Sequence, residues 1–320
     1  MKSLLNTIIF LLAVSCLQGK TLFVTASGTG DGSSWLRSLG DLNMALQMVQ
    51  SGDTIFVAAG TYLPTKDNNR HKSFRIKNGI HLYGGFAGTE RHIGERNIER
   101  NPTILSGEIG ANGPEDNSYN VLFSQGVDST TVIDGITITG GNANGEGEAG
   151  TRTRCGGAWY MDASNGGDIR PNVRNVIFKD NRGRDGAAIY CLTRAAGHCS
   201  PSFLNCSFLN NKADLDGGAL YTDTRGQGAC RPTFERCLFA KNVGSYGAGL
   251  FSRIEDGTCI LHLTNCVFQG NAAYLWGGGI YNIQPYTGEY ELHLIECEFD
   301  GNYPTDINKT YFLGPKPRKD

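Results

Sequence analysis

Residues 217–242 read GGALYTDTRGQGACRPTFERCLFAKN, and four other segments of the chain repeat this phrase. Successive copies start 30, 31, 30 and 30 residues apart, at Gly156, Gly186, Gly217, Gly247 and Gly277. Self-similarity at a fixed period of about 20–50 residues is the signature of a repeat architecture in which each copy forms one supersecondary unit. The spacing therefore predicts five coils stacked along one axis.

Equivalent positions of the five copies carry the same type of side chain. The Cys-x-Phe alternation has the two-residue period of a β-strand, and the runs are too short and too often broken by Gly, Asn and Asp for helices. A unit of this length fits one coil of a parallel β-helix. We expect inward ladders and corner residues at the following positions: Phe178, Phe208, Phe239, Phe268 and Phe299; Cys206, Cys237, Cys266 and Cys297; and Asn181, Asn211, Asn242, Asn271 and Asn302.

The Asn column has a specific predicted role. Asn tolerates the left-handed backbone of a tight corner, and its amide group can bond to the Asn of the next coil. The paired glycines that begin the copies predict a second sharp corner, because glycine adopts positive φ without strain.

The chain before the repeats predicts an irregular continuation of the same solenoid. Leu42, Ala45, Leu46 and Val49 recur with helical spacing, so this helix is expected to close the open end of the coil and cover its edge. The expected organisation is a signal peptide in 1–19 and a β-helix in 20–303, comprising a strand and cap helix in 20–52, irregular coils in 53–150 and five regular coils of about 30 residues in 155–302, followed by a tail in 304–320.

Composition and the N-terminus indicate an exported protein. The net charge is −2 and the pI is about 6.3, and no basic stripe indicates a nucleic-acid partner. Lys2, an apolar run and small residues resemble a secretory signal, and Cys16 offers a site for lipid attachment. No later segment has 18 consecutive apolar residues, so we expect no transmembrane span in the mature chain.

Two groups of phrases resemble known families. The combination of GG-A-[ILV] with F-x-x-N resembles the repeat of chlamydial-type polymorphic outer membrane proteins, and all five copies carry F-x-x-N. The front half resembles secreted bacterial proteins of the right-handed β-helix, pectate-lyase-like superfamily; the phrases are GDTIFVAAGTY (52–62), LYGGFAGTE (82–90), TILSGEIG (103–110) and IDGITITGGNA (133–143). The resemblance implies an all-β fold, a single-stranded right-handed parallel β-helix with an N-terminal capping helix. It does not imply an activity, because the superfamily mixes lyases, hydrolases, adhesins and stalks.

Two pairs of residues are candidates for catalysis. Asp185 and Asp216 immediately precede the leading glycines of their copies, and Arg194 and Arg225 follow the tyrosines by four residues. A polysaccharide lyase needs clustered carboxylates for calcium and a base that takes the proton α to a carboxylate. The alternative is that these residues lie in solvated turns, where Asp and Arg are common.

Aromatic residues continue the column that contains the two aspartates. Tyr246 and Trp276 take the equivalent positions in the last two copies, and Tyr274 is nearby. A flat pair of rings on neighbouring coils would form a stacking platform for a sugar. The alternative is that the rings cover a corner of the core.

The cysteines are expected to be mostly free and buried, because stacked inward cysteines hold their Cβ atoms farther apart than a disulfide allows. One bridge is expected at most, among the loop cysteines Cys191, Cys199 and Cys230. The Cys-x₆-Cys spacing is not a zinc signature, and no metal site is predicted.

The even repeat favours a secreted or cell-surface β-helix protein without catalysis, with a structural, adhesive or glycan-contacting role. The alternative is a calcium-dependent polysaccharide lyase acting on a uronate-containing glycan, so enzyme activity stays open. We expect no cofactor, apart from calcium if the alternative holds. The expected partner is an extracellular or cell-surface polysaccharide, with docking at the exposed C-terminal edge.

Overall fold

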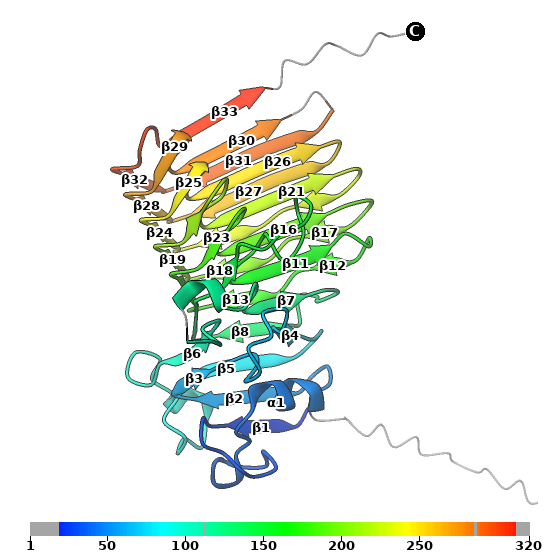
Figure 1. The fold of residues 1–320 in the computed structure, drawn as a ribbon, viewed down its shortest axis with the longest axis vertical. Helices are drawn as coiled ribbons and strands as arrows, with labels where there is room; N and C mark the ends of the chain where they lie inside the picture. Colours follow the sequence, from blue (N-terminus) through cyan, green and yellow to red (C-terminus); the bar gives the residue numbers. More distant parts are fainter. Residues whose placement is uncertain (1–18, 112, 285–286, 312–320) are drawn as a thin grey trace, which may run out of the picture.

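The computed structural model describes residues 19–111, 113–284 and 287–311 (Figure 1). The chain folds as an all-β parallel β-solenoid of about nine turns. Among the described residues it contains one α-helix, α1 (Leu42–Met48), and three short 3-10 helices: η1 (Trp35–Arg37), η2 (Ile93–Glu95) and η3 (Gly113–Asp116). Cys16 and all but the last residue of the expected signal peptide lie outside the described residues.

Four parallel sheets form the walls of the solenoid. Sheet A contains β1 (Thr21–Val24), β2 (Thr54–Ala58), β5 (His81–Phe86), β8 (Val132–Asp134), β13 (Asn172–Arg174), β18 (Ser202–Leu204), β23 (Thr233–Glu235), β27 (Thr258–Thr264) and β31 (Glu289–Ile295), with the short strands β12 (Asp168–Ile169), β17 (His198–Cys199) and β22 (Ala229–Cys230) joined through β27. Sheet B contains β3 (Gly60–Tyr62), β6 (Thr103–Ser106), β9 (Ile136–Thr139), β14 (Ile177–Lys179), β19 (Ser207–Leu209), β24 (Leu238–Ala240), β28 (Val267–Gln269) and β32 (Glu298–Asp300).

The other two sheets complete the coil. Sheet C contains β4 (Phe74–Ile76), β7 (Leu122–Ser124), β11 (Trp159–Ala163), β16 (Ile189–Thr193), β21 (Leu220–Arg225), β26 (Leu250–Glu255), β30 (Ile280–Gln284) and β33 (Ile307–Tyr311). Sheet D contains β10 (Asn142–Ala143), β15 (Arg182–Gly183), β20 (Lys212–Ala213), β25 (Val243–Tyr246) and β29 (Ala272–Trp276). A regular coil thus passes from sheet C through sheets A, B and D and returns to sheet C one level higher in Figure 1.

The register of the sheets places like residues on top of one another. Phe208 pairs with Phe239 in sheet B, and Tyr190 pairs with Tyr221 in sheet C. Inside the solenoid, the rings of the predicted Phe column lie 4.5 to 4.9 Å apart and nearly parallel, from Phe178 to Phe299. This spacing allows continuous ring stacking, so the column forms a spine through the core.

The Asn column forms a continuous hydrogen-bonded ladder. The backbone N–H and the Nδ2 of Asn211 both donate to Oδ1 of Asn242, at 3.1 and 3.0 Å, and the same pattern runs from Asn181 to Asn302. The Nδ2 of Asn242 also donates to the carbonyl oxygen of Phe208, at 2.9 Å. The ladder therefore satisfies the amide groups of residues that are buried in the wall.

One detail of the corner prediction is wrong. The residue with positive φ is the one before each ladder Asn, as in Asn210 (φ 54°) and Lys241 (φ 55°). The ladder Asn is left free to turn its amide inward and bond along the axis. The glycine corner is present: Gly217 has φ 69°, and an added Cβ would lie 2.7 Å from the carbonyl oxygen of Leu220.

The helix lies where the sequence places it. The carboxylate of Asp41 accepts from the backbone N–H groups of Asn43 and Met44 and caps the N-terminus of α1. Leu42, Ala45 and Leu46 are buried. Because α1 precedes β2 as β4 precedes β5, and contacts β4, the helix covers the open edge of sheet C.

The far end of the solenoid extends beyond the expected boundary. Strand β33 pairs with β30 in sheet C, so part of the segment predicted as a tail continues the wall. The remainder of that predicted tail, residues 312–320, lies outside the described residues.

Candidate functional site

The outer face of sheet C is a second apolar cluster. Tyr160, Tyr190, Tyr221, Phe251 and Tyr281 project outward from successive strands, and their side chains are buried. The phenolic O–H of Tyr160 donates to the carbonyl oxygen of Gly150 at 2.6 Å. Residue 150 belongs to the connection between β10 and β11, so this connection folds over the face.

Arg225 is held by a buried carboxylate on this face. Its guanidinium donates to both oxygens of Asp223, at 2.8 and 2.7 Å, and Asp223 is fully buried. The O–H of Tyr190 donates to the same carboxylate at 2.5 Å. Hydrogen bonds to Asp223 raise the pKa of the Arg225 guanidinium, which opposes a role as a base. Arg194 is exposed in the turn after β16, one coil away.

Asp185 and Asp216 lie on successive coils at the rim of the same cluster. Burial raises the pKa of Asp185 to about 6 and that of Asp216 to about 7, and the charge of Asp185 adds to the effect at Asp216. The thiol of Cys155 donates to Oδ2 of Asp185, with 3.9 Å between Sγ and Oδ2. Carboxyl groups that retain protons near neutral pH are poor ligands for calcium.

The aromatic candidates separate into two environments. Trp276 pairs with Tyr246 between β29 and β25, next to an irregular register. The ring of Tyr246 lies 4.9 Å from that of Tyr281, so Tyr246 joins the covered cluster. Trp276 and Tyr274 stay exposed, by 50% and 68%, and Tyr303 on the following segment is 67% exposed.

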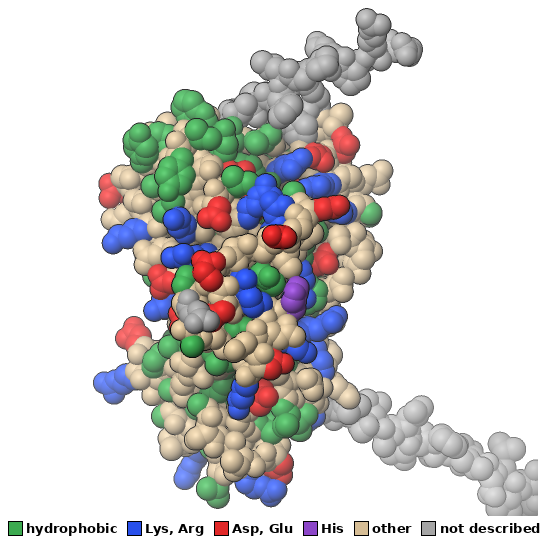
Figure 2. Space-filling view, in the orientation of Figure 1, with side chains coloured by type: hydrophobic (Ala, Val, Ile, Leu, Met, Phe, Trp, Pro, Cys, Tyr) green, Lys and Arg blue, Asp and Glu red, His purple; other side chains and the backbone are tan. Residues whose placement is uncertain are grey.

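Apolar side chains gather at this end of the molecule. Figure 2 shows a green patch near the C-terminal end of the solenoid, where β29 lies in Figure 1. Leu275 and Ile307 are also exposed there. A solvent-exposed patch of aromatic rings and aliphatic side chains is typical of a site that binds a ligand or another protein.

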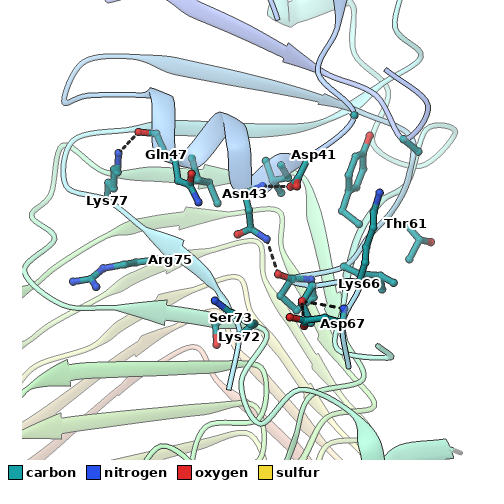
Figure 3. Close-up of a pocket in the computed structure, with 18 residues that line it drawn as sticks. Asp41, Asn43, Gln47, Thr61, Lys66, Asp67, Lys72, Ser73, Arg75 and Lys77 are labelled. Atoms are coloured by element: carbon teal, nitrogen blue, oxygen red, sulfur yellow. Dashed lines mark hydrogen bonds between the residues drawn. The ribbon is translucent and has the colours of Figure 1, made fainter. Parts of the chain in front are cut away.

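A surface groove of about 790 Å³ lies beside α1 at the other end of the solenoid (Figure 3). Lys72 and Arg75 line one side of the groove, and Lys66, on the loop after β3, lines it as well. All three side chains are exposed. The sequence contains this basic stretch, but the groove depends on the packing of α1 against β4.

Several charged groups at the groove are engaged in local structure. Asp41 caps α1, and the carboxylate of Asp67 accepts from the hydroxyl of Thr65. The ammonium of Lys77 donates to the carbonyl oxygens of Gln47 and Val49 near the C-terminus of α1, at 2.7 and 3.0 Å. The remaining cations make the groove suited to anions.

Comparison with known proteins addresses the repeat. The family model of the Chlamydia polymorphic membrane protein repeat matches residues 205–223 and 265–283. The protein is a parallel β-helix protein with polymorphic membrane protein-like repeats. The repeat family is associated with bacterial outer-membrane and surface proteins. No curated protein and no solved structure gave a significant match to the chain.

Both matched segments of this β-helix protein cover the same part of a coil. They run from the corner before sheet B, through sheets B and D and the glycine corner, into sheet C. The family pattern therefore describes the wall and its corners. Within the described part of the chain, the β-helix protein has no helix long and apolar enough to cross a membrane.

The sequence did not indicate that Asp223, Tyr190 and Cys155 lie with Asp185 and Asp216 on the outer face of sheet C. The position of Asp223 is occupied by Asp162, Leu192 and Arg253 in other coils, so no repeated column marks it. The nearest signal was its place two residues before Arg225 on the same face of β21.

Proposed function

We propose that this protein is a non-catalytic β-helix module of the cell exterior that contacts polysaccharide through Trp276 and Tyr274. The observation that carries the proposal is the exposure of these rings on β29. Aromatic rings combine an apolar face with little conformational entropy, so they provide contact area at low cost. The neighbouring Tyr303 adds a third exposed ring from the next coil.

The groove beside α1 favours an acidic polysaccharide. Lys66, Lys72 and Arg75 line its open side, while Leu42 and Tyr62 contribute to its floor. Cations attract carboxylate or sulfate groups along a chain, and the attraction weakens as salt concentration rises. An acidic glycan that reaches both regions would gain affinity from two linked contacts.

The lyase alternative finds less support in the surroundings of its candidate residues. Arg225 is committed to Asp223, and Asp185 is buried with a raised pKa. Catalysis by these groups would require the connection over sheet C to move. A partner protein docked at the C-terminal edge is the remaining alternative, because Ile295 and Ile307 on the last strands are exposed.

The test measures binding of uronate-containing, sulfated and neutral polysaccharides to the purified chain by affinity electrophoresis. Trp276→Ala and Tyr274→Ala should each reduce the retardation, and the affinity derived from it should fall by about tenfold or more. Leu36→Ala is the control, because Leu36 is 96% exposed and lies near the opposite end of the chain. Retardation unaffected by Trp276→Ala and Tyr274→Ala would reject the proposal, and release of unsaturated uronate products would favour the lyase.

A further inference from the structure

Three cysteine side chains meet inside the solenoid. Cys191 projects inward from β16, Cys199 from β17 and Cys230 from β22. Their Sγ atoms all lie within 4.8 Å of one another, and all three residues are fully buried. The expectation that they are loop residues is wrong, since each lies in a strand; no disulfide joins them, or any other of the nine described cysteines.

The surroundings of the trio are rich in soft and polar donors. The Sδ of Met161, one coil below, lies 3.8 Å from Sγ of Cys191. Thr193 follows Cys191 on the same face of β16 and pairs with Thr224. Both threonine hydroxyls are buried without a hydrogen-bond partner in the described part of the chain, and an unpaired buried hydroxyl is costly.

The other cysteine ladder is built differently. The Sγ atoms of Cys206, Cys237 and Cys266 each lie 3.4 to 3.6 Å from two backbone carbonyl oxygens that can accept the S–H. These thiols have partners in the wall and need no further ligand. Cys259, which stacks on Cys230, lies 3.4 Å from the hydroxyl of Thr222. Among the described residues, the trio is distinguished because all three of its sulfur atoms lie within 4.8 Å of one another.

The Sγ atoms of the three cysteines lie close enough together for one ion to contact all of them, and Sδ of Met161 lies 3.8 Å from Sγ of Cys191. Thiolates are the form of cysteine that binds metals.

We propose that Cys191, Cys199 and Cys230 bind one thiophilic metal ion, Cu(I) or Zn(II), inside the solenoid, with Met161 as an additional sulfur neighbour. Soft thiolate and thioether donors select these ions over magnesium or calcium. Zinc–sulfur bonds of about 2.3 Å place tetrahedral ligand sulfurs roughly 3.7 Å apart, so small side-chain shifts close the site. Each thiol that binds releases its proton to solvent, and no electron transfer is needed.

A disulfide is the competing outcome for the same sulfurs. Cys199 and Cys230 are register partners on neighbouring parallel strands. Strands in a sheet lie about 4.8 Å apart, whereas a disulfide requires Cβ atoms about 3.8 Å apart. For this pair, metal binding therefore requires less movement of the backbone than a disulfide.

The test combines metal analysis with native mass spectrometry. The chain is refolded under reducing conditions, separately with Cu(I) and with Zn(II), and is then freed of unbound ion. We expect one ion per folded chain in one or both arms. Cys191→Ser and Cys230→Ser should each weaken retention at least tenfold, whereas Cys237→Ser, a matched buried cysteine of the other ladder, should retain the ion.

A second measurement covers variants that do not fold. In the unmutated chain, bound metal should protect these three buried cysteines from alkylation at a denaturant concentration that unfolds the metal-free chain. A chelator should remove this difference between metal-loaded and metal-free chain. Absence of bound ion in both arms would overturn the proposal. A disulfide between any two of the three cysteines would also overturn the proposal. It would be seen as a loss of two hydrogens in mass after refolding without an oxidant.

Discussion

Trp276 and Tyr246 are register partners on neighbouring coils, yet Trp276 is half exposed while Tyr246 packs against Tyr281. The register of β25 and β29 shifts between Gly244 and Tyr246, immediately before this pair. The column therefore changes along the axis from carboxyl groups at the rim of a buried cluster to an exposed ring. This change localises the proposed glycan contact to the last coils.

The Asn ladder makes a prediction about stability. Asn242→Ala removes the Oδ1 that accepts from both the backbone N–H and Nδ2 of Asn211. The buried N–H is then left without a partner among the described contacts, while Nδ2 keeps the carbonyl oxygen of Phe178. We expect a loss of about 2–4 kcal/mol in the free energy of unfolding, measured by urea denaturation. Gln269→Ala is the control, because Gln269 is an exposed amide residue on β28; equal losses in the two variants would argue against the ladder as a stabilising element.

The carboxyl pair makes a prediction about pH. The pKa of Asp216 in the fold, about 7, lies above its usual value of 3.8, so the folded state binds the proton more tightly than the unfolded state. The resulting stability is complete below about pH 4 and is lost as pH rises through 7. Asp216→Asn should therefore lessen the loss of stability between pH 5 and pH 8, by about 1–3 kcal/mol. An identical pH dependence in the variant and the unmutated chain would refute this.

The role of Arg225 can be separated from catalysis. Arg225→Ala leaves the carboxylate of Asp223 buried with only the Tyr190 hydroxyl as a partner among the contacts described, so we expect a loss of about 3–5 kcal/mol in stability. Tyr190→Phe should cost less, about 1–2 kcal/mol, because the ion pair remains. Thermal denaturation of both variants, with exposed Arg231→Ala as the control, tests this order. A fully stable Arg225→Ala chain would contradict a structural role.

The basic groove makes a prediction about salt. Lys66→Gln, Lys72→Gln and Arg75→Gln combined should lower affinity for a uronate-containing polysaccharide and flatten its dependence on salt. The groove should keep its shape, because Lys77, which bonds to the end of α1, is unchanged. Lys241→Gln, an exposed lysine on the regular coils, is the control. Unchanged salt dependence in the triple variant would remove the groove from the binding account.

The repeated columns allowed the interior of the solenoid to be predicted. Phe239 and Asn242 each recur in every regular coil, and a parallel stack converts such recurrence directly into a ladder. The left-handed residue was assigned to the Asn instead of its predecessor, because Lys241, Asn210 and Gly270 share no residue type. A backbone requirement that different residues meet leaves no column in the sequence.

Features that occur once could not be predicted. The connection that places Gly150 over Tyr160 has no counterpart in the other coils, so its packing on sheet C had no repeated signal. Cys191 meets Cys199 and Cys230 only because the turn between sheets C and A brings two strands together. Local spacing does not contain this distance, which explains why the trio was assigned to loops.

Intrinsic fluorescence tests the central claim, that Trp276 contacts polysaccharide, most directly. The other two tryptophans are Trp159, which is fully buried, and Trp35, which lies against Phe23 near the N-terminus. Titration with a polysaccharide that binds should shift or quench the emission of the unmutated chain, and Trp276→Phe should abolish that change. Binding without a change in emission, or a change that persists in Trp276→Phe, would contradict the account.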